Sequence, residues 1–298
     1  MKKLLISLVI LAAVVFGGLK FNANKVEEKY NEALSLFKAN GMDVKNSVFD
    51  GGLLKSHANY DVILSKSYMN ELVSLGEEYG MPEDLTMKID MDISHGFASL
   101  LGKFDITGDI EYLNDPYKNL VKEIFDTSKP IKLHANGALS GDKNFVFELA
   151  GVQKEKDGNK INLAKSFLKF TINGDKKITG ASFANDLIDF TGKESIAIKV
   201  KNIDYDMKYE TPIEPKMISK TFVNSIYKFE LGGIDVSLGA EALQIGKITS
   251  DSKLIVLSDT LTQDDTSTIE KIKYANFEFK DFLIKSKVAN LDKGAFED

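Results

Sequence analysis

The sequence lacks cysteine altogether and contains only five prolines in 298 residues. The lack of cysteine excludes disulfide bonds, thiol catalysis, Cys-ligated zinc or iron–sulfur sites and a lipidated N-terminal cysteine. The scarcity of proline excludes a long proline-rich linker. No basic block stands out, and the formal net charge is −6, so nucleic acid is not expected as a partner.

Motifs for catalysis and cofactor binding are missing as well. There is no Gly-x-Ser-x-Gly elbow, no phosphate-binding Walker loop and no Gly-x-Gly-x-x-Gly fingerprint after a strand pattern. The acidic residues Asp251, Asp259, Asp264 and Asp265 do not form a calcium-loop motif, and we assign them to polar turns at strand ends. We therefore expect no catalytic residue, no cofactor and no metal site, and a protein that is not an enzyme.

The N-terminus carries the strongest local signal. Lys2 and Lys3 precede an uncharged, mostly apolar run from Leu4 to Leu19. A basic flank stays in the cytoplasm, so the remainder of the chain is expected to cross the membrane. Residues 1–21 are thus a signal peptide or a membrane anchor in the form of a hydrophobic helix. The absence of a good Ala-x-Ala cleavage site favours a retained anchor.

Most of the remaining chain alternates between apolar or small residues and polar residues. Period-two alternation predicts strands with one face on a core and one face in water, which are typical of antiparallel sheets. The clearest segments of this kind are residues 54–62, 87–93, 104–112 and 131–139. The fold class is therefore mainly β (α+β), with a large antiparallel sheet or meander.

Glycine-containing turns separate these segments. Asp157-Gly158 and Asn173-Gly174 predict two-residue hairpins. The alternation changes phase between Val200 and Ile203, and again across Gly232-Gly233. A change of phase without a turn predicts a β-bulge, which bends and twists a strand, so we expect long strands and a strongly curved sheet.

Helical patterns are few. Residues 24–41 predict a helix next to the membrane segment, and residues 67–80 predict a second helix. A third is expected from Asp115 as the N-cap, with Pro116 at the first helical position. We predict a single β-rich domain over residues 22–298, with a possible minor break at 210–217.

Two short motifs resemble the YdgA-like family of bacterial envelope proteins. The first runs from Gly52 to Ser56, and the second is the pair His95-Gly96 after a strand pattern. The closing stretch, which contains Asn290, Leu291, Asp292 and Ala295, is similar as well. The chain departs from the family pattern at Gly51, Leu53 and Phe97, where the family has an arginine, an aromatic residue and a proline. Members are commonly longer, so the chain is either a short relative or an N-terminal half.

The resemblance implies a protein on the periplasmic side of the bacterial inner membrane, and it implies no reaction. Its motif residues Gly52, Ser56, His95 and Gly96 are expected to be structural. A hairpin corner explains His95 and Gly96, since glycine readily takes a positive φ. His57 and His134 fall on the polar phase of their strands and are expected on the surface. Asp90 and Asp92 share a polar strand face with Lys88 beside them.

A large one-sided sheet with few helices must cover its apolar face, because exposing it costs about 25 cal/mol per Å². The leading hypothesis is a non-enzymatic, membrane-tethered β domain that acts as a binding or scaffolding surface, with a lipid or another hydrophobic ligand as the possible occupant. A self-associating interaction module, hence a homo-oligomer, is the first alternative. A periplasmic hydrolase that uses His95 is the second.

Overall fold

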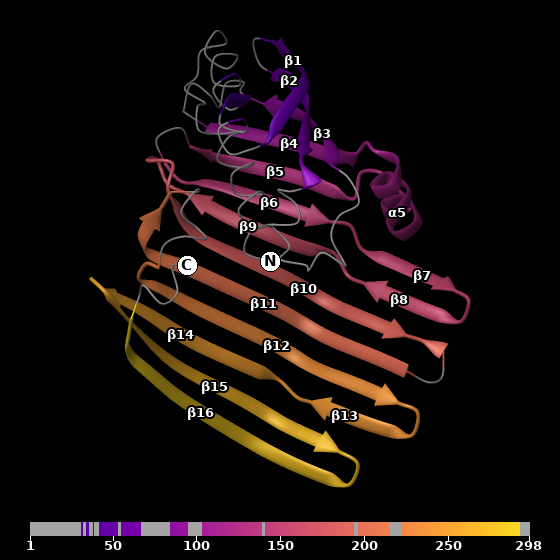
Figure 1. Cartoon of the computed structure of the whole chain (residues 1–298), viewed down its shortest axis with the longest axis vertical. Coiled ribbons are helices and arrows are strands. Elements are labelled where there is room, and N and C mark those ends of the chain that lie inside the picture. Colours follow the sequence, from indigo (N-terminus) through magenta and orange to yellow (C-terminus); the bar gives the residue numbers. More distant parts are fainter. Residues whose placement is uncertain are drawn as a thin grey trace. The chain divides into compact units, whose positions relative to one another are not determined.

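The computed structural model describes residues 42–52, 55–66, 84–94, 103–138, 141–193, 196–214 and 222–292, together with residues 31, 34, 35 and 38. It confirms a mainly β protein with a large antiparallel sheet, and the described part contains one short helix outside residues 31–38 (Figure 1). The chain divides into two units. Unit 1 comprises residues 1–148, 170–178 and 213–220, and unit 2 comprises residues 149–169, 179–212 and 221–298.

Unit 1 is built on consecutive antiparallel strands in the order β1-β2-β3-β4-β5-β6. Their bounds are β1 Asp43–Gly51, β2 Lys55–Leu64, β3 Leu85–Ser94, β4 Lys103–Tyr112, β5 Ile131–Ala138 and β6 Lys143–Leu149. These strands confirm the four alternating segments expected from the sequence. Strand β9, Ser166–Ile172, contributes its last residues to unit 1.

The apolar phase of each strand in unit 1 forms the core. Burial in β2 alternates strictly, so that Ala58, Tyr60 and Val62 are buried while their sequence neighbours are partly exposed. Phe145 of β6 is fully buried. Phe147 and Phe170 meet edge to face, with ring centroids 6.4 Å apart. This geometry is the one that the ring quadrupoles favour.

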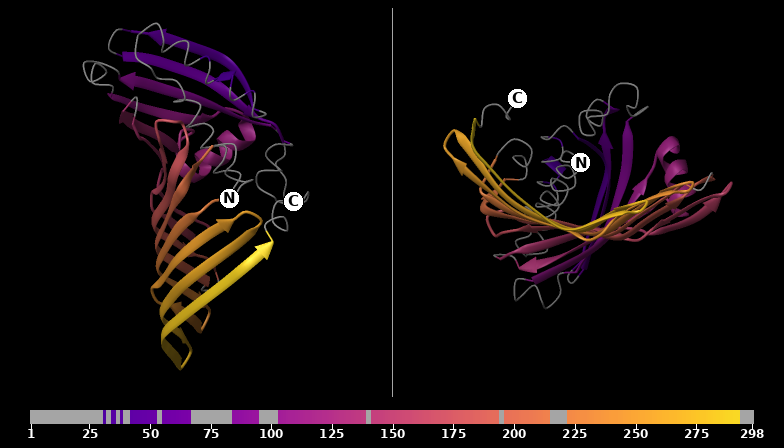
Figure 2. Two further views of the ribbon diagram at one scale, coloured as in Figure 1. Left: turned by 90° about the vertical axis from the view of Figure 1, so that its left-hand side faces the viewer. Right: turned by 90° about the horizontal axis from the view of Figure 1, so that it is seen from below.

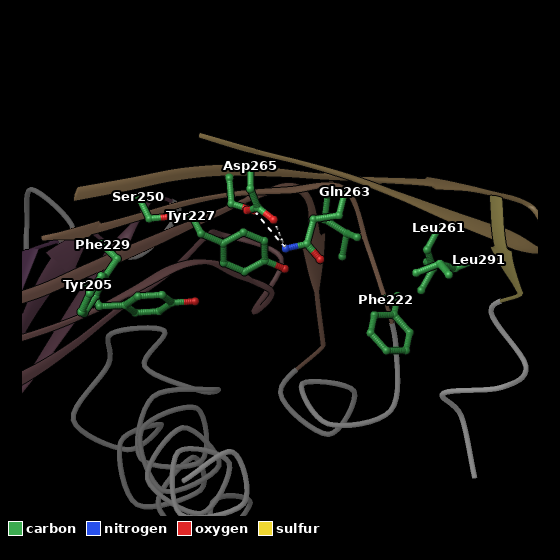
Figure 3. Close-up of a pocket in the computed structure, with 11 residues that line it drawn as sticks. Tyr205, Phe222, Tyr227, Phe229, Ser250, Leu261, Gln263, Asp265 and Leu291 are labelled. Carbon is green, nitrogen blue, oxygen red and sulfur yellow. Dashed lines mark hydrogen bonds between the residues drawn. The ribbon is translucent and has the colours of Figure 1, made fainter. Parts of the chain in front are cut away.

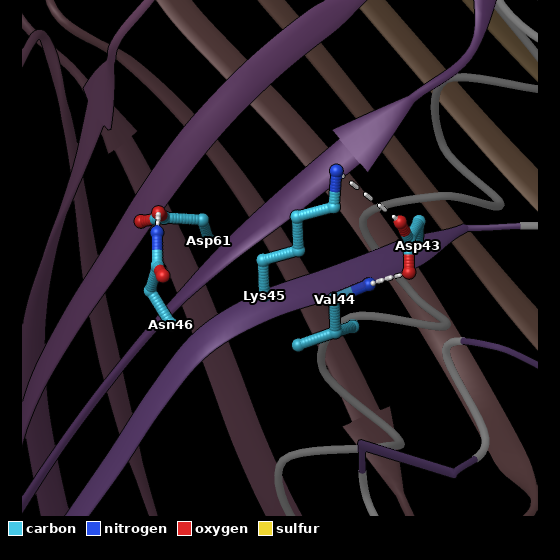
Figure 4. Close-up of polar contacts among 5 residues, drawn as sticks. All are labelled: Asp43, Val44, Lys45, Asn46 and Asp61. Carbon is cyan, nitrogen blue, oxygen red and sulfur yellow. Dashed lines mark hydrogen bonds and ion pairs between the residues drawn. The ribbon is translucent and has the colours of Figure 1, made fainter.

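Strand β1 contains a bulge that the alternation pattern does not reveal. Its register against β2 shifts by one residue between Lys45 and Val48. Asn46 lies at this shift with a left-handed φ of 50°, and its Nδ2 donates a hydrogen bond to Asp61 Oδ2 at 2.6 Å (Figure 4). Asparagine tolerates this backbone conformation better than most residues do, so the side chain and the backbone together define the bulge.

The helix expected from Asp115 is α5, Asp115–Phe125, but its N-cap is Asn114 rather than Asp115. The Asn114 side chain makes no capping bond. Its Oδ1 accepts a hydrogen bond from Thr86 N, and its Nδ2 donates one to the Asp84 carbonyl. Asn114 therefore ties the start of the helix to the start of β3. Asp115 lies in the first turn, where a carboxylate favours the helix dipole.

One of the two hairpin predictions is confirmed and one is wrong in detail. Asp157 and Gly158 both have positive φ and join β7, Val152–Lys156, to β8, Asn159–Leu163, in a two-residue turn. Asn173 instead opens a longer loop, because its Oδ1 accepts hydrogen bonds from the backbone N–H groups of Asp175 and Lys177. The asparagine side chain thus replaces a tight turn with an Asx-type loop.

Unit 2 contains the longest strands of the described chain. The strands from β10 onward are β10 Ile178–Thr191, β11 Ile196–Ile213, β12 Ser225–Leu238, β13 Glu241–Ile245, β14 Ile248–Leu257, β15 Thr260–Tyr274 and β16 Phe277–Asp292. Strand β12 pairs with β11 on one edge, and with β13 and β14 in succession on the other. Strand β15 pairs with β13, β14 and β16. The long strands bend along their length, as Figure 2 shows.

The phase change expected near Gly232-Gly233 is present, but it is not a bulge. The register of β11 against β12 is the same on both sides of it, so no residue is inserted. Instead Asn202 takes a φ of 48°, and Gly233 takes a φ of 148°. A Cβ atom on Gly232 would lie 2.9 Å from Asn202 Nδ2. Gly233 pairs with Lys201, so the irregular residues of the two strands lie one position apart in the register.

This irregularity continues across unit 2. Gly246, between β13 and β14, donates its N–H to the Lys271 carbonyl of β15 at 2.8 Å. Asp281 of β16, with a φ of 57°, lies between the residues that pair with Lys271 and with Ile269. We call the line through Asn202, Gly233, Gly246 and Asp281 the crease. It coincides with the change of apolar phase in β11 and β12.

Several predictions fall outside the described residues. These are the hydrophobic helix over 1–21, the helix over 67–80 and most of the helix over 24–41. No helix in the described part of the chain is long and apolar enough to cross a membrane. The domain limits, including the possible break at 210–217, remain predictions.

Candidate functional site

Two of the four motif residues lie in the described part of unit 1. Gly52 follows β1, and a Cβ atom there would lie 2.4 Å from the Lys55 carbonyl oxygen, so the turn has no room for a side chain. Ser56 is buried in β2 and pairs with Ile93, near the end of β3. His95 and Gly96 come directly after β3 but lie outside the described residues. Their structural role therefore stays a prediction.

A histidine and two aspartates meet on the polar face of unit 1. His57 Nε2 lies 3.2 Å from Asp90 Oδ1, and His57 Nδ1 lies 3.0 Å from Asp92 Oδ1. The register that sets His57 opposite Asp92 brings the three side chains together. Ser56 points to the buried face, since successive strand residues alternate. This arrangement fixes the imidazole ring, and no serine in the described part of the chain forms a hydrogen bond with it.

On one side of the crease, the sheet of unit 2 is formed mainly by β12, β14 and β15. The two faces of this part of the sheet differ in their chemistry. On one face, charged side chains form cross-strand ion pairs. These are Lys228–Asp251 at 3.9 Å, Lys253–Glu210 at 3.1 Å, Lys287–Asp264 at 3.4 Å and Lys247–Glu230 at 2.7 Å. Exposed pairs of this kind contribute little to stability, but they identify the solvated face.

The opposite face of these strands forms a groove of about 370 Å³ (Figure 3). This volume is within the range of about 300–1,000 Å³ that is typical of small-molecule sites. Its apolar and aromatic lining residues are Tyr205, Phe222, Tyr227, Phe229, Leu254, Leu261 and Leu291. Figure 3 shows Phe222, Leu261 and Leu291 at one end and Tyr205 and Phe229 at the other. We call the first group, with Leu254, the leucine end.

A polar band crosses the groove between its two apolar ends. Its residues within the groove lining are Ser250, Ser252, Gln263 and Asp265. Gln263 Nε2 donates hydrogen bonds to Asp265 Oδ2 at 2.9 Å and to Ser252 Oγ at 3.3 Å. Ser286 of β16 donates a further bond to the same Asp265 oxygen at 3.4 Å. The groove therefore combines apolar surface with a few oriented polar groups.

Tyr205, which lines the groove, and Tyr209 on the same strand are held in their neutral form by a raised pKa. Burial, assisted by the nearby Tyr227, raises the pKa of Tyr209 to about 12. Burial also raises the pKa of Tyr205, and Tyr227, Tyr209 and Asp206 add to the effect. Near neutral pH these hydroxyls therefore act as neutral hydrogen-bonding groups and not as bases.

These pKa shifts predict a loss of stability at alkaline pH. A tyrosine whose pKa is higher in the folded state stabilises that state fully below its unfolded pKa of about 10. This contribution is lost as the pH rises from about 10 through the folded value. Urea unfolding at a series of pH values should show this decline, and Tyr209→Phe should make it shallower. A decline of equal slope in the variant would contradict the assignment.

Within the described ranges, no group of three or more histidine, aspartate or glutamate side chains is placed to hold a metal ion. Among the described residues that line the groove there is no histidine and no lysine. The lining offers apolar contact at both ends and hydrogen bonding between them.

The groove residues were only partly predictable. The sequence alternation of Tyr205 with Ile203, and of Tyr227 and Phe229 with Leu231, places these aromatic residues on the apolar phase of their strands. The assignment to turns is confirmed for Asp259 but is wrong for the other three aspartates, because Asp251 lies in β14 and Asp264 and Asp265 lie in β15. The i, i+2 relation of Asp265 to Gln263 on one strand face is the signal that could have shown this.

Comparison with known proteins gives one result. No curated protein and no solved structure matches the chain, so the YdgA-like name stays a resemblance. The model of the family described as "Bacterial protein of unknown function (DUF945)" matches residues 1–298. The chain therefore belongs to this bacterial family, DUF945.

Proposed function

We propose that the protein is a non-enzymatic component of the bacterial cell envelope whose unit 2 binds a hydrophobic or amphiphilic molecule in the groove. The observation that carries the proposal is the contrast between the two faces of the same strands. One face carries ion pairs such as Lys253–Glu210, and the other carries an apolar groove. Water contact with the groove lining is unfavourable in proportion to its apolar area, so an apolar occupant gains free energy there.

The location follows from the sequence of residues 1–21. A basic flank before an apolar run favours export and a tether on the periplasmic side of the inner membrane. A fusion of alkaline phosphatase, which is active only after export, to the C-terminus tests this proposal. Activity that depends on residues 1–21 is expected, and an inactive fusion would contradict an exported domain.

A charge at the leucine end should abolish binding. Leu291→Lys places an ammonium group in the groove, where a bound acyl chain would strip it of water. We expect the amount of amphiphile that co-purifies with the full chain to fall at least about tenfold, as measured by lipid extraction and mass spectrometry. Leu257→Lys is the matched control, because Leu257 is 57% exposed and does not line the groove. Equal loss in both variants, or loss in neither, would contradict the proposal.

Self-association remains a second candidate, and one observation favours it. Strand β16 pairs with β15 only, so one of its edges is free within the described residues. Phe277, Phe279 and Leu283 on this strand are each more than half exposed. Long apolar edge strands readily accept another strand. Light scattering should then give a dimer that Leu283→Lys dissociates, and a strict monomer at high concentration would eliminate this candidate.

The hydrolase alternative depends on His95, which lies outside the described residues. The contacts of His57 give it no support, since that ring lies between two carboxylates and no described serine forms a hydrogen bond with it. Replacement of His95 by alanine would abolish a hydrolase activity that depends on it, and retained activity would eliminate this role.

A further inference from the structure

Asp265 is the only charged residue among the described residues that line the groove. Lys287, on the adjacent strand β16, lies on the other face of the sheet, where it pairs with Asp264. Asp265 forms no ion pair with any described residue. Its two hydrogen-bond donors, Gln263 and Ser286, are both neutral.

The position of this carboxylate relative to the apolar surface is also specific. Asp265 is flanked by its paired residues on the neighbouring strands, Ser252 of β14 and Ser286 of β16. Two residues further along β15, Ser267 donates a hydrogen bond to Ser250. The leucine end begins on the other side, with Leu254 opposite Gln263. A molecule that lies along the groove therefore meets a polar, negatively charged band next to an apolar one.

Both Asp265 donors use the same oxygen, Oδ2. Its Oδ1 accepts no hydrogen bond from the described residues. A carboxylate oxygen with free lone pairs in a partly desolvated groove favours a positively charged donor and repels an anion. An ammonium group satisfies it, whereas a fatty-acid carboxylate opposes it.

We propose that the groove selects long-chain amphiphiles with a primary-amine head group, with the amine on Asp265 and the chain along the leucine end. This inference rests on the proposed function and adds the class of ligand. It distinguishes the groove from one that accepts any apolar chain. It also excludes anionic single-chain lipids as preferred ligands.

The test compares three probes of equal chain length: an alkyl amine, the corresponding alcohol and the corresponding fatty acid. Each is titrated calorimetrically, below its micelle concentration, into the full chain freed of co-purified lipid. We expect the amine to bind roughly fivefold more tightly than the alcohol and the fatty acid to bind most weakly. This factor is intermediate between an exposed ion pair and a buried charged hydrogen bond.

Asp265→Asn should remove the preference for the amine, so that the amine and the alcohol bind with similar affinity. Asp264→Asn is the matched control, since Asp264 is the preceding residue on the opposite face and should change nothing. A fatty acid that binds as tightly as the amine, or an Asp265→Asn variant that retains the preference, would overturn the amine assignment alone. If none of the three probes binds, the groove itself is not a site for amphiphiles, and both proposals fail.

Discussion

Phe145→Ala is expected to lower the free energy of unfolding of unit 1 by about 3–5 kcal/mol. Phe145 is fully buried in β6, on the same strand face as Phe147, which meets Phe170 edge to face. Truncation removes most of a ring from a close-packed core, and the neighbouring strands can collapse only partly into the cavity. Urea denaturation followed by circular dichroism measures the change.

The control for this substitution is Leu120→Ala on α5. Leu120 is 54% exposed, so its truncation should change the free energy of unfolding by less than about 1 kcal/mol. A similar, small effect for both variants would show that the apolar face of β6 is not packed as the structure describes.

Gly233→Val is expected to destabilise unit 2 by about 2–4 kcal/mol, through backbone strain and a steric clash. Gly233 has a φ of 148°, which residues with a side chain rarely adopt. A Cβ atom there would also lie 3.0 Å from the Ile245 carbonyl oxygen on β13. Because Gly233 lies on the crease, this strain should reach both β11 and β13.

Gly239→Asn is the matched control for the crease. Gly239 also has a positive φ, 61°, but a Cβ atom there meets nothing within 4 Å, and asparagine tolerates this conformation. We expect a change of less than about 1 kcal/mol by thermal unfolding. If Gly233→Val is equally mild, the crease is not a fixed feature of the sheet.

The strands of unit 1 were predictable because the alternation within each strand sequence shows which of its residues are buried. In β2 and β4 the apolar residues recur at every second position, and this local pattern is sufficient to assign a strand and its buried face. The pairing between strands could not be predicted in this way. His57 meets Asp90 and Asp92 through a register across a long connection, and such a register does not follow from the two strand sequences taken separately.

The crease and the polar band also depend on strand register and could not be predicted from single strand sequences. A phase change at Gly232-Gly233 is visible in one strand, but its alignment with Asn202 and Asp281 depends on how four or more strands pair. Asp265 resembles a turn residue, because aspartates cluster around it in the sequence. Only the pairing with Ser252 and Ser286 shows that it faces a groove.

Photo-crosslinking can test whether the groove face of unit 2 holds an amphiphile. The probe is an alkyl amine that carries a diazirine near the end of its chain, and it is added to the full chain. The labelled peptides, mapped by mass spectrometry, should contain Leu254, Leu261 or Leu291, and labelling should decrease when unlabelled amine competes. Labelling confined to unit 1, or labelling that unlabelled amine does not reduce, would contradict the account.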